Sequence, residues 1–134
     1  MPLVNIDLLE GRTQEELRLI GDSVHEAMIE QLNVPKRDRF QIITQHTPAT
    51  LQFDRDYLDI ERGDRFVMVR VTLAAGRSAD AKAAFYGQLA GLLADRIGLR
   101  GEDLAVILVE NDRADWSFGR GQASYLVLPR EQWR

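Results

Sequence analysis

The sequence contains no cysteine and only two histidines, His25 and His46, among its 134 residues. The lack of cysteine excludes disulfides and thiolate metal sites, and two histidines are too few for a convincing metal cluster. No apolar run approaches the length of a membrane-spanning helix and no signal peptide is visible, so we expect a cytoplasmic protein that does not bind a membrane. The net charge is −4, with acidic and basic residues mixed throughout, which leaves no basic footprint for nucleic acid.

The apolar content is sufficient for one core. With 45% hydrophobic residues, a chain of this length is the size of one domain, which we expect to span residues 1–134. Sliding the chain against itself by 65 positions aligns residues 2–46 with residues 67–111 and leaves residues 112–134 as a C-terminal extension. The aligned pairs include Val4 with Val69, Ile6 with Val71, Leu8 with Leu73, Asp38 with Asp103, and Gly11-Arg12-Thr13 with Gly76-Arg77-Ser78.

Each repeat has the pattern of a strand, a Gly-Arg turn, a helix, a charged turn and a strand. The strands are predicted at residues 3–9, 40–44, 66–73 and 105–110. Thr13 with Glu16 forms a capping box for the first helix, and Ser78 caps the second. Right-handed crossovers then give an α+β fold of two β-α-β repeats, with a four-stranded mixed sheet and both helices on one face. The apolar stripes that predict the helices are Leu17, Ile20, Val24, Met28 and Leu32, and Phe85, Leu89, Leu92, Leu93 and Ile97.

Two segments have no counterpart in this strand and helix pattern. Residues 48–65 are rich in charge and are predicted to form a surface connection between the repeats. The C-terminal extension contains Trp116-Ser117-Phe118-Gly119-Arg120-Gly121 and then the apolar run Tyr125–Leu128. We expect that run to be a short strand that pairs with the sheet edge of another subunit.

Pro2 follows Met1 and opens the first predicted strand. Removal of Met1 would make Pro2 the N-terminus, with a secondary amine that has no amide resonance and whose direction the pyrrolidine ring fixes. An α-amino group ordinarily titrates near 8, so a modest environmental shift decides whether it donates or accepts a proton at neutral pH. A small residue after Met1 is also common without any function, and one residue is a weak signal.

A pseudo-twofold axis between the repeats would make the first and third strands antiparallel neighbours, which puts Pro2 next to Arg77. Arg77 precedes the second helix, where the helix dipole and free N–H groups help it to attract a carboxylate. Asp38 precedes the second strand and could orient the amine or raise its pKa, although its repeat mate Asp103 fits ordinary turn chemistry. The counterpart of Pro2, Val67, lies inside the chain, so we expect one site per subunit.

Aromatic residues of the C-terminal extension are candidates for the wall of this site. Trp116 and Phe118 would exclude water there, although aromatic residues in a glycine-rich loop are often part of a core. His46 is expected to be a surface or hydrogen-bonded histidine and not a catalytic base.

These residues together resemble the tautomerase superfamily. Pro2, the two β-α-β units and an arginine after the third strand carry the resemblance over nearly the whole chain. The segments similar to its malonate semialdehyde decarboxylase branch are Asp38-Arg39-Phe40-Gln41, Gln45-His46, and Glu110-Asn111 with Asp115-Trp116-Ser117-Phe118-Gly119-Arg120-Gly121. The resemblance implies a homotrimer of tautomerase-like subunits, with a proline at each site and no metal or organic cofactor.

The resemblance also implies roles for the candidate residues. In this branch a cationic Pro2 polarises the carbonyl of a 3-oxo acid, Arg77 holds the carboxylate, Asp38 supports the charged amine, and Trp116 and Phe118 line the cavity. Loss of carbon dioxide leaves an enolate, which is then protonated.

Some members of the branch carry an Arg-x-Arg pair after the third strand, whereas this chain has Ala75-Gly76-Arg77. A single guanidinium can still bind a carboxylate in a bidentate manner. Arg70 and Arg120 are candidates for additional positive charge, with directions that the sequence leaves open.

We therefore expect a cofactor-independent decarboxylase of a small 3-oxo acid such as malonate semialdehyde, with keto-enol tautomerase activity. One alternative is an enzyme that is primarily a tautomerase of 2-hydroxy-dienoate or phenylenolpyruvate-type enol acids, in which a neutral Pro2 moves a proton between carbons. A second alternative is a non-catalytic trimeric binding protein, which a retained Met1 would favour because an acylated Pro2 nitrogen is a neutral amide. The expected partners are a small carboxylate substrate and further copies of the chain.

Overall fold

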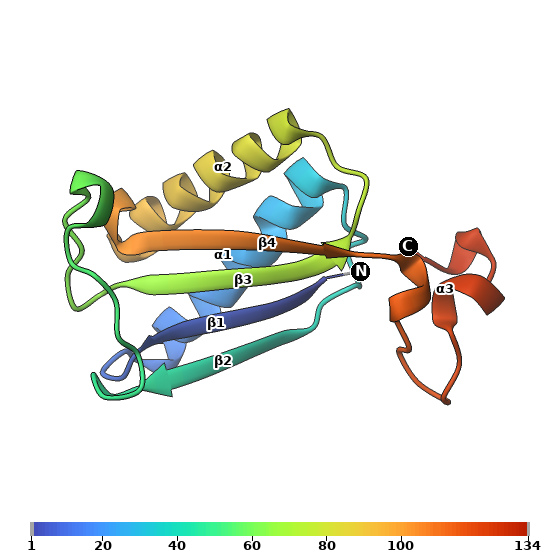
Figure 1. Cartoon of the computed structure of the whole chain (residues 1–134), viewed down its shortest axis with the longest axis horizontal. Coiled ribbons are helices and arrows are strands. Elements are labelled where there is room, and N and C mark those ends of the chain that lie inside the picture. The colour runs from blue at the N-terminus through green and yellow to red at the C-terminus, as the bar shows by residue number, and fades with distance from the viewer. Residues whose placement is uncertain (1, 134) are drawn as a thin grey trace.

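The structure, a computed structural model, describes residues 2–133. Met1, on whose removal a free Pro2 amine depends, lies outside the described residues. Four strands form one sheet in the order β2-β1-β3-β4, with β1 antiparallel to β3 and each outer strand parallel to its neighbour (Figure 1). The strands are β1 (Leu3–Leu9), β2 (Gln41–His46), β3 (Val67–Ala74) and β4 (Leu104–Asn111). The predicted four-stranded mixed sheet is confirmed, with strand ends that differ from the prediction by at most two residues.

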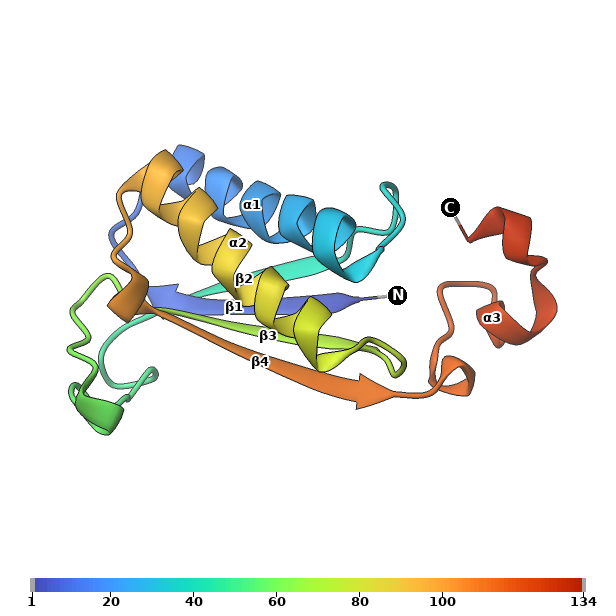
Figure 2. The ribbon, with the colours of Figure 1, turned by 90° about the horizontal axis from the view of Figure 1, so that it is seen from above.

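Two long helices, α1 (Gln14–Leu32) and α2 (Ala79–Ile97), cover the same face of the sheet, as Figure 2 shows. Each begins at the predicted cap, because Thr13 and Ser78 accept the N–H of the third helical residue at 3.1 Å. The predicted capping box is only half formed: the Glu16 carboxylate forms an ion pair with Arg65 at 3.0 Å.

The two turns that lead into these helices use glycine for the same reason. Gly11 and Gly76 have φ angles of +118° and +132°, a region that side chains rarely adopt and that glycine enters without a steric cost. Each turn therefore reverses the chain directly after a strand and brings the following arginine, Arg12 or Arg77, to an end of the sheet.

The core lies between the sheet and the two helices. Alternate residues of the central strands point into it, and Val4, Ile6, Val69 and Val71 are fully buried. The helical stripes supply the other side, although Leu17, Leu92 and Ile97 lie at the edge of the core and are only partly buried. No helix within residues 2–133 is long and apolar enough to cross a bilayer.

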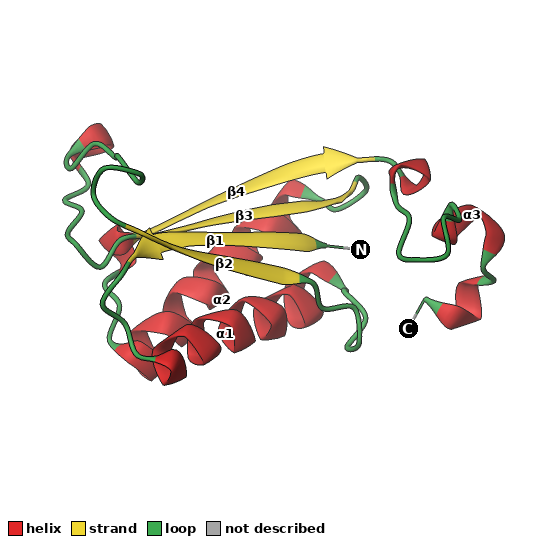
Figure 3. Cartoon of the chain, turned by 90° about the horizontal axis from the view of Figure 1, so that it is seen from below, coloured by secondary structure: helices red, strands yellow, loops and turns green. Residues whose placement is uncertain are grey.

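The opposite face of the sheet has no helix over it (Figure 3). Four large apolar side chains stand exposed on this face, at 51% for Ile42, 40% for Met68, 51% for Ile107 and 41% for Val109. We call this surface the helix-free face. Exposed apolar side chains gathered on one face are typical of a surface that contacts another molecule.

The C-terminal extension forms short helical turns beyond the end of β4. It contains α3 (Ser124–Val127) between two 3₁₀ turns, Arg113–Asp115 and Arg130–Gln132. The strand predicted at Tyr125–Leu128 is therefore wrong. The run folds as a helical turn that directs Tyr125 toward Phe118 and Trp133, and a helical turn has no strand edge to offer to another subunit.

Candidate active site

The candidate site lies where the start of β1 meets the end of β3 and the loop after α1. Leu3 pairs with Thr72 in the antiparallel ladder, so Pro2 lies one residue further along, level with Leu73, and it is buried. On the other side of β1, the Val4 N–H donates to the Phe40 carbonyl at 2.9 Å. Figure 1 shows the start of β1 beside the end of β3. The topology thus brings Pro2 to the end of the sheet that also carries Asp38 and Arg77.

Two main-chain carbonyls hold the Arg77 guanidinium. Its Nε donates to the Leu32 carbonyl at 2.9 Å and its Nη1 to the Ala74 carbonyl at 2.8 Å. Burial lowers the pKa of Arg77, the carboxylates of Glu110 and Asp38 act in the opposite direction, and the group stays protonated. The Nη2 protons make no hydrogen bond within residues 2–133. An anion could accept hydrogen bonds from them.

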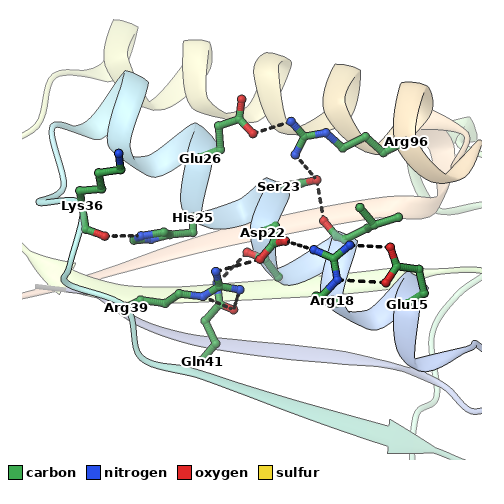
Figure 4. Close-up of polar contacts among 12 residues, drawn as sticks. Glu15, Arg18, Asp22, Ser23, His25, Glu26, Lys36, Arg39, Gln41 and Arg96 are labelled. Atoms are coloured by element: carbon green, nitrogen blue, oxygen red, sulfur yellow. Dashed lines mark hydrogen bonds and ion pairs between the residues drawn. The ribbon is translucent and has the colours of Figure 1, made fainter.

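Hydrogen bonds from α1 fix the loop that leads to β2 (Figure 4). The His25 Nε2 donates to the Lys36 carbonyl at 2.8 Å. Arg39 forms an ion pair with Asp22 at 2.8 Å, and the Gln41 side-chain amide donates to a main-chain carbonyl of α1 at 2.8 Å. These contacts hold the loop on both sides of Asp38.

Asp38 also contacts the C-terminal extension. The Tyr125 hydroxyl donates to the Asp38 Oδ2 at 3.4 Å. Burial raises the pKa of Tyr125, and the negative charge of Asp38 raises it further, so the hydroxyl remains protonated at neutral pH and acts as a donor. The extension is thereby tied to the candidate site through a polar contact as well as through aromatic packing.

A cavity of about 700 Å³ opens between the end of α1, the end of β3 and the extension. Its charged lining residues are Lys36, Asp38, Arg77 and Arg113. The remaining wall is largely apolar and includes Leu32, Val34, Pro35, Ala74, Tyr125 and Trp133. Pro2 is not among the lining residues. A volume in the range of roughly 300–1,000 Å³ with a few converging polar groups is typical of a small-molecule site.

The two aromatic residues predicted for the wall do not line this cavity. Phe118 lines a neighbouring cavity of about 320 Å³ that shares Asp38, Tyr125 and Trp133 with the first. Trp116 stacks on Phe118 with ring centroids 5.5 Å apart and does not line either cavity. The aromatic rings that reach the main cavity are therefore Tyr125 and Trp133, whose centroids lie 5.0 Å apart.

Sequence reasoning missed Arg113, Tyr125 and Trp133. They belong to the extension, which has no repeat mate, so the internal alignment offers no guide to their position. The two arginines considered as extra charge lie elsewhere. Arg70 is exposed on β3, where it pairs with Asn5 of β1 and with Ile107 of β4. Arg120 is exposed in a turn.

The other end of the sheet carries Arg12 and Asp103, the repeat mates of Arg77 and Asp38. Both side chains bond to the chain before β3, so we call this the closed end of the sheet. The Arg12 guanidinium donates to the Arg65 carbonyl, and its side chain is 3% exposed. Asp103 accepts the Gly63 N–H at 2.6 Å and lies 3.2 Å from the Arg100 Nε. The chain before β3 therefore occupies the groups that a ligand would need.

His46 is engaged by its neighbours. Its Nε2 lies 2.6 Å from the Asp7 carboxylate and its Nδ1 lies 3.0 Å from the Thr50 hydroxyl. This geometry agrees with the interpretation of His46 as a hydrogen-bonded residue. Within residues 2–133 no group of three or more histidine, aspartate or glutamate side chains is arranged to hold a metal ion.

Comparison with known proteins adds independent information. Two tautomerase enzyme families match the chain, one across residues 38–119 and one across residues 2–58. The chain is 36% identical over 126 residues to the probable tautomerase YusQ of Bacillus subtilis (strain 168), across 94% of this chain and 99% of that protein. A solved malonate semialdehyde decarboxylase with decarboxylase and hydratase activities shares 38% identity and a TM-score of 0.87, over 92% of this chain and 95% of that one. A fused 4-OT symmetric trimer has the same fold, with 21% identity, a TM-score of 0.74 and coverage of 92% and 96%.

The closed end of the sheet predicts a pH-dependent contribution to stability. Burial acts to raise the pKa of Asp103, but the Gly63 N–H and Arg100 outweigh it and hold the pKa below its ordinary value. The ionised Asp103 carboxylate therefore contributes to the free energy of unfolding above the pKa of an aspartate in the unfolded chain, about 4. This contribution is lost as the pH falls through the lower pKa that Asp103 has in the folded protein. We expect Asp103→Asn to lower the free energy of unfolding at pH 7 by about 1–3 kcal/mol and to flatten its decline toward pH 3, as measured by urea unfolding.

The control for this prediction is Asp59→Asn, because Asp59 is exposed in the connection between the repeats. It should change the free energy of unfolding by less than about 0.5 kcal/mol. An Asp103→Asn protein with the wild-type acid dependence would show that the closed end does not depend on this carboxylate.

Proposed function

This chain belongs to the tautomerase superfamily, in the malonate semialdehyde decarboxylase-like branch, and we propose that it is a cofactor-independent decarboxylase of small 3-oxo acids that also catalyses keto-enol tautomerisation. The observation that carries the proposal is the Arg77 guanidinium, fixed by two carbonyls at the same end of the sheet as Pro2 and Asp38. The 38% identity to a malonate semialdehyde decarboxylase supports it.

In the proposed reaction Pro2 is the N-terminus and its nitrogen carries a proton. The cation donates a hydrogen bond to the carbonyl oxygen of the 3-oxo acid, while Arg77 binds the carboxylate through its Nη2, which makes no hydrogen bond within the described residues. The bond between the carboxylate carbon and the α-carbon breaks, carbon dioxide leaves, and the electron pair forms an enolate that the cation stabilises. Protonation of the α-carbon completes the reaction. Asp38 supports the positive charge on the amine.

A specific observation favours the tautomerase as a second candidate, because the B. subtilis relative is described as a probable tautomerase. In that reaction Pro2 is the free base and moves a proton between the oxygen and a carbon of an enol acid. The same arginine would bind the carboxylate in both cases, so the protonation state of Pro2 separates the two chemistries. Membership of an enzyme superfamily does not favour the non-catalytic alternative.

We also propose that three copies of the chain assemble through the helix-free face. The supporting observations are the exposed side chains of Ile42, Met68, Ile107 and Val109 and the trimeric state of the fused 4-OT protein of the same fold. Burial of apolar surface stabilises an interface by about 25 cal/mol per Å², so a sheet face of this composition favours association.

The first test of the proposed function replaces the secondary amine of Pro2, whose direction the pyrrolidine ring fixes, with the primary amine of alanine, whose direction no ring fixes. Malonate semialdehyde, phenylenolpyruvate and 2-hydroxymuconate are assayed with the wild type and with Pro2→Ala, after intact mass has established whether Met1 is absent. General acid catalysis contributes roughly 10²–10⁴-fold, so Pro2→Ala should lower kcat by at least about 100-fold. Equal rates for the two proteins would remove Pro2 from the mechanism.

The second test distinguishes decarboxylase from tautomerase. We expect an NMR titration of the ¹⁵N-labelled N-terminal nitrogen to give a pKa above 7, because the Asp38 carboxylate favours the cation. Asp38→Asn should lower that pKa. A wild-type pKa well below 7 would exclude the proposed polarisation step and leave the tautomerase reaction.

The assembly is tested by Ile107→Lys, which introduces a charge on the outer strand β4, within the helix-free face. We expect light scattering to give a wild-type mass three times the 15.3 kDa of one chain, and the variant to shift toward the mass of the single chain. Ala94→Lys, on the exposed side of α2, is the control and should keep the wild-type mass. A wild-type protein that is monomeric at micromolar concentration would contradict the proposal.

A further inference from the structure

The main cavity concentrates positive charge in a protein that is acidic as a whole. Among residues 2–133, three cations, Lys36, Arg77 and Arg113, line it together with a single carboxylate, Asp38, although the chain has a net charge of −4. Clefts lined by one sign of charge focus the electric field and raise the local concentration of ligands of the opposite sign. One substrate carboxylate on Arg77 leaves the second guanidinium without an anion.

The position of Arg113 is fixed by the chain on both sides. The Asn111 carbonyl accepts the Ala75 N–H at 2.8 Å, which ties the end of β4 to the turn before Arg77. Directly after it, the Asp112 N–H donates to the Asp115 carboxylate at 2.8 Å and the Asp115 N–H donates to the Asp112 carbonyl at 3.0 Å. Arg113 therefore extends from a closed turn at the edge of the cavity.

The Arg113 side chain lies over an aromatic ring and not beside an acid. Its guanidinium carbon is 5.0 Å from the centre of the Trp133 ring, and Trp133 itself lines the cavity. Within residues 2–133 Arg113 has no ion pair. Many other arginines of the chain do have one, namely Arg12, Arg18, Arg39, Arg55, Arg65, Arg96 and Arg100. A cation-π contact keeps the cation in place and leaves its N–H groups free for an anion.

The charge of Arg113 is felt by the other groups of the cavity. Burial is the main cause that lowers the pKa of Arg77, and the positive charge of Arg113 lowers it further. Two like charges around one cavity repel each other, and a ligand with two anionic groups would relieve this repulsion at both positions. A cavity of about 700 Å³ also has much more room than a three-carbon acid of six heavy atoms fills.

We propose that Arg113 binds a second anionic group of the substrate, so that the preferred ligand is a dicarboxylate of four or five carbons held between Arg77 and Arg113. This inference rests on the proposed function for the role of Arg77 and extends it by naming the substrate class. The carboxylate on Arg77 is the one that reacts, and the carboxylate on Arg113 stays in the product. Arg113 is in this sense a specificity-determining residue supplied by the C-terminal extension.

The test compares dicarboxylates and monocarboxylates of equal carbon number at constant ionic strength. Succinate is paired with butyrate and glutarate with valerate, and binding is followed at pH 7 by tryptophan fluorescence and by calorimetry. Fluorescence is suitable because Trp133 lies under Arg113. We expect the wild type to bind the better dicarboxylate at least 10-fold more tightly than its monocarboxylate partner.

Arg113→Ala should reduce this preference to less than twofold while the affinity for the monocarboxylate stays within twofold of the wild type. Arg113→Lys keeps the charge but loses the planar fork, and it should retain part of the preference. The matched control is Arg120→Ala, because Arg120 belongs to the same extension, is exposed and does not line the cavity. It should retain the full preference.

Two outcomes would overturn the inference: a wild type without a preference for dicarboxylates, or an Arg113→Ala protein that keeps it. If Arg113→Ala fails to fold by circular dichroism, the decision rests on Arg113→Lys and on the wild type. Failure of the proposed function is separately visible, because Pro2→Ala measures turnover and leaves both guanidiniums in place. A protein that prefers dicarboxylates but has no Pro2-dependent turnover would retain the second anion site and lose the proposed reaction.

Discussion

The antiparallel pairing of β1 with β3 is the constraint on which the rest of the structure depends. It runs from Leu3 opposite Thr72 to Leu8 opposite Val67 and joins two β-α-β units that are otherwise parallel within themselves. Because the pairing is antiparallel, the beginning of the first unit meets the end of the second. A shift of one residue would turn Val4 and Ile6 out of the core, so burial of these side chains fixes the same register that aligns Pro2 with the strand end before Arg77.

The same pairing creates two equivalent ends, and the chain closes one of them. At the far end the residues before β3 bring the Gly63 N–H to Asp103 and the Arg65 carbonyl to Arg12. At the near end the repeat mate of Asp103, Asp38, accepts a hydrogen bond from the Tyr125 hydroxyl of the extension. A symmetric scaffold thus yields one candidate site, because a polar group that is paired within the fold contributes to stability and is withdrawn from a ligand.

The sequence predicts the repeated part of the molecule well and the unrepeated part poorly. The alternation of Val4, Ile6 and Leu8 and the helical spacing of Phe85, Leu89 and Leu93 each have one solution that buries their apolar atoms, so the strands and helices follow from the pattern. The antiparallel pairing of β1 with β3 follows from the repeat and its twofold relation. The placement of Arg77 and Asp38 at one end of the sheet could be predicted because both lie beside the ends of those elements. Tyr125–Leu128 could not, because four apolar residues fit a strand or a helical turn equally, and the aromatic contacts of Tyr125 decide between them.

The division between core and extension has a functional consequence. The core supplies a proline, an aspartate and an arginine whose positions are set by strand pairing and by the segments that flank the helices, so this part of the proposed chemistry is tied to the fold itself. The extension meets the core through Tyr125 on Asp38 and through aromatic packing, and these contacts do not specify which side chain occupies the place of Arg113. We expect a change at that position to alter the charge facing a ligand without disturbing the sheet. If the proposals hold, substrate choice is separable from the reacting groups, and the segment with no repeat mate carries it.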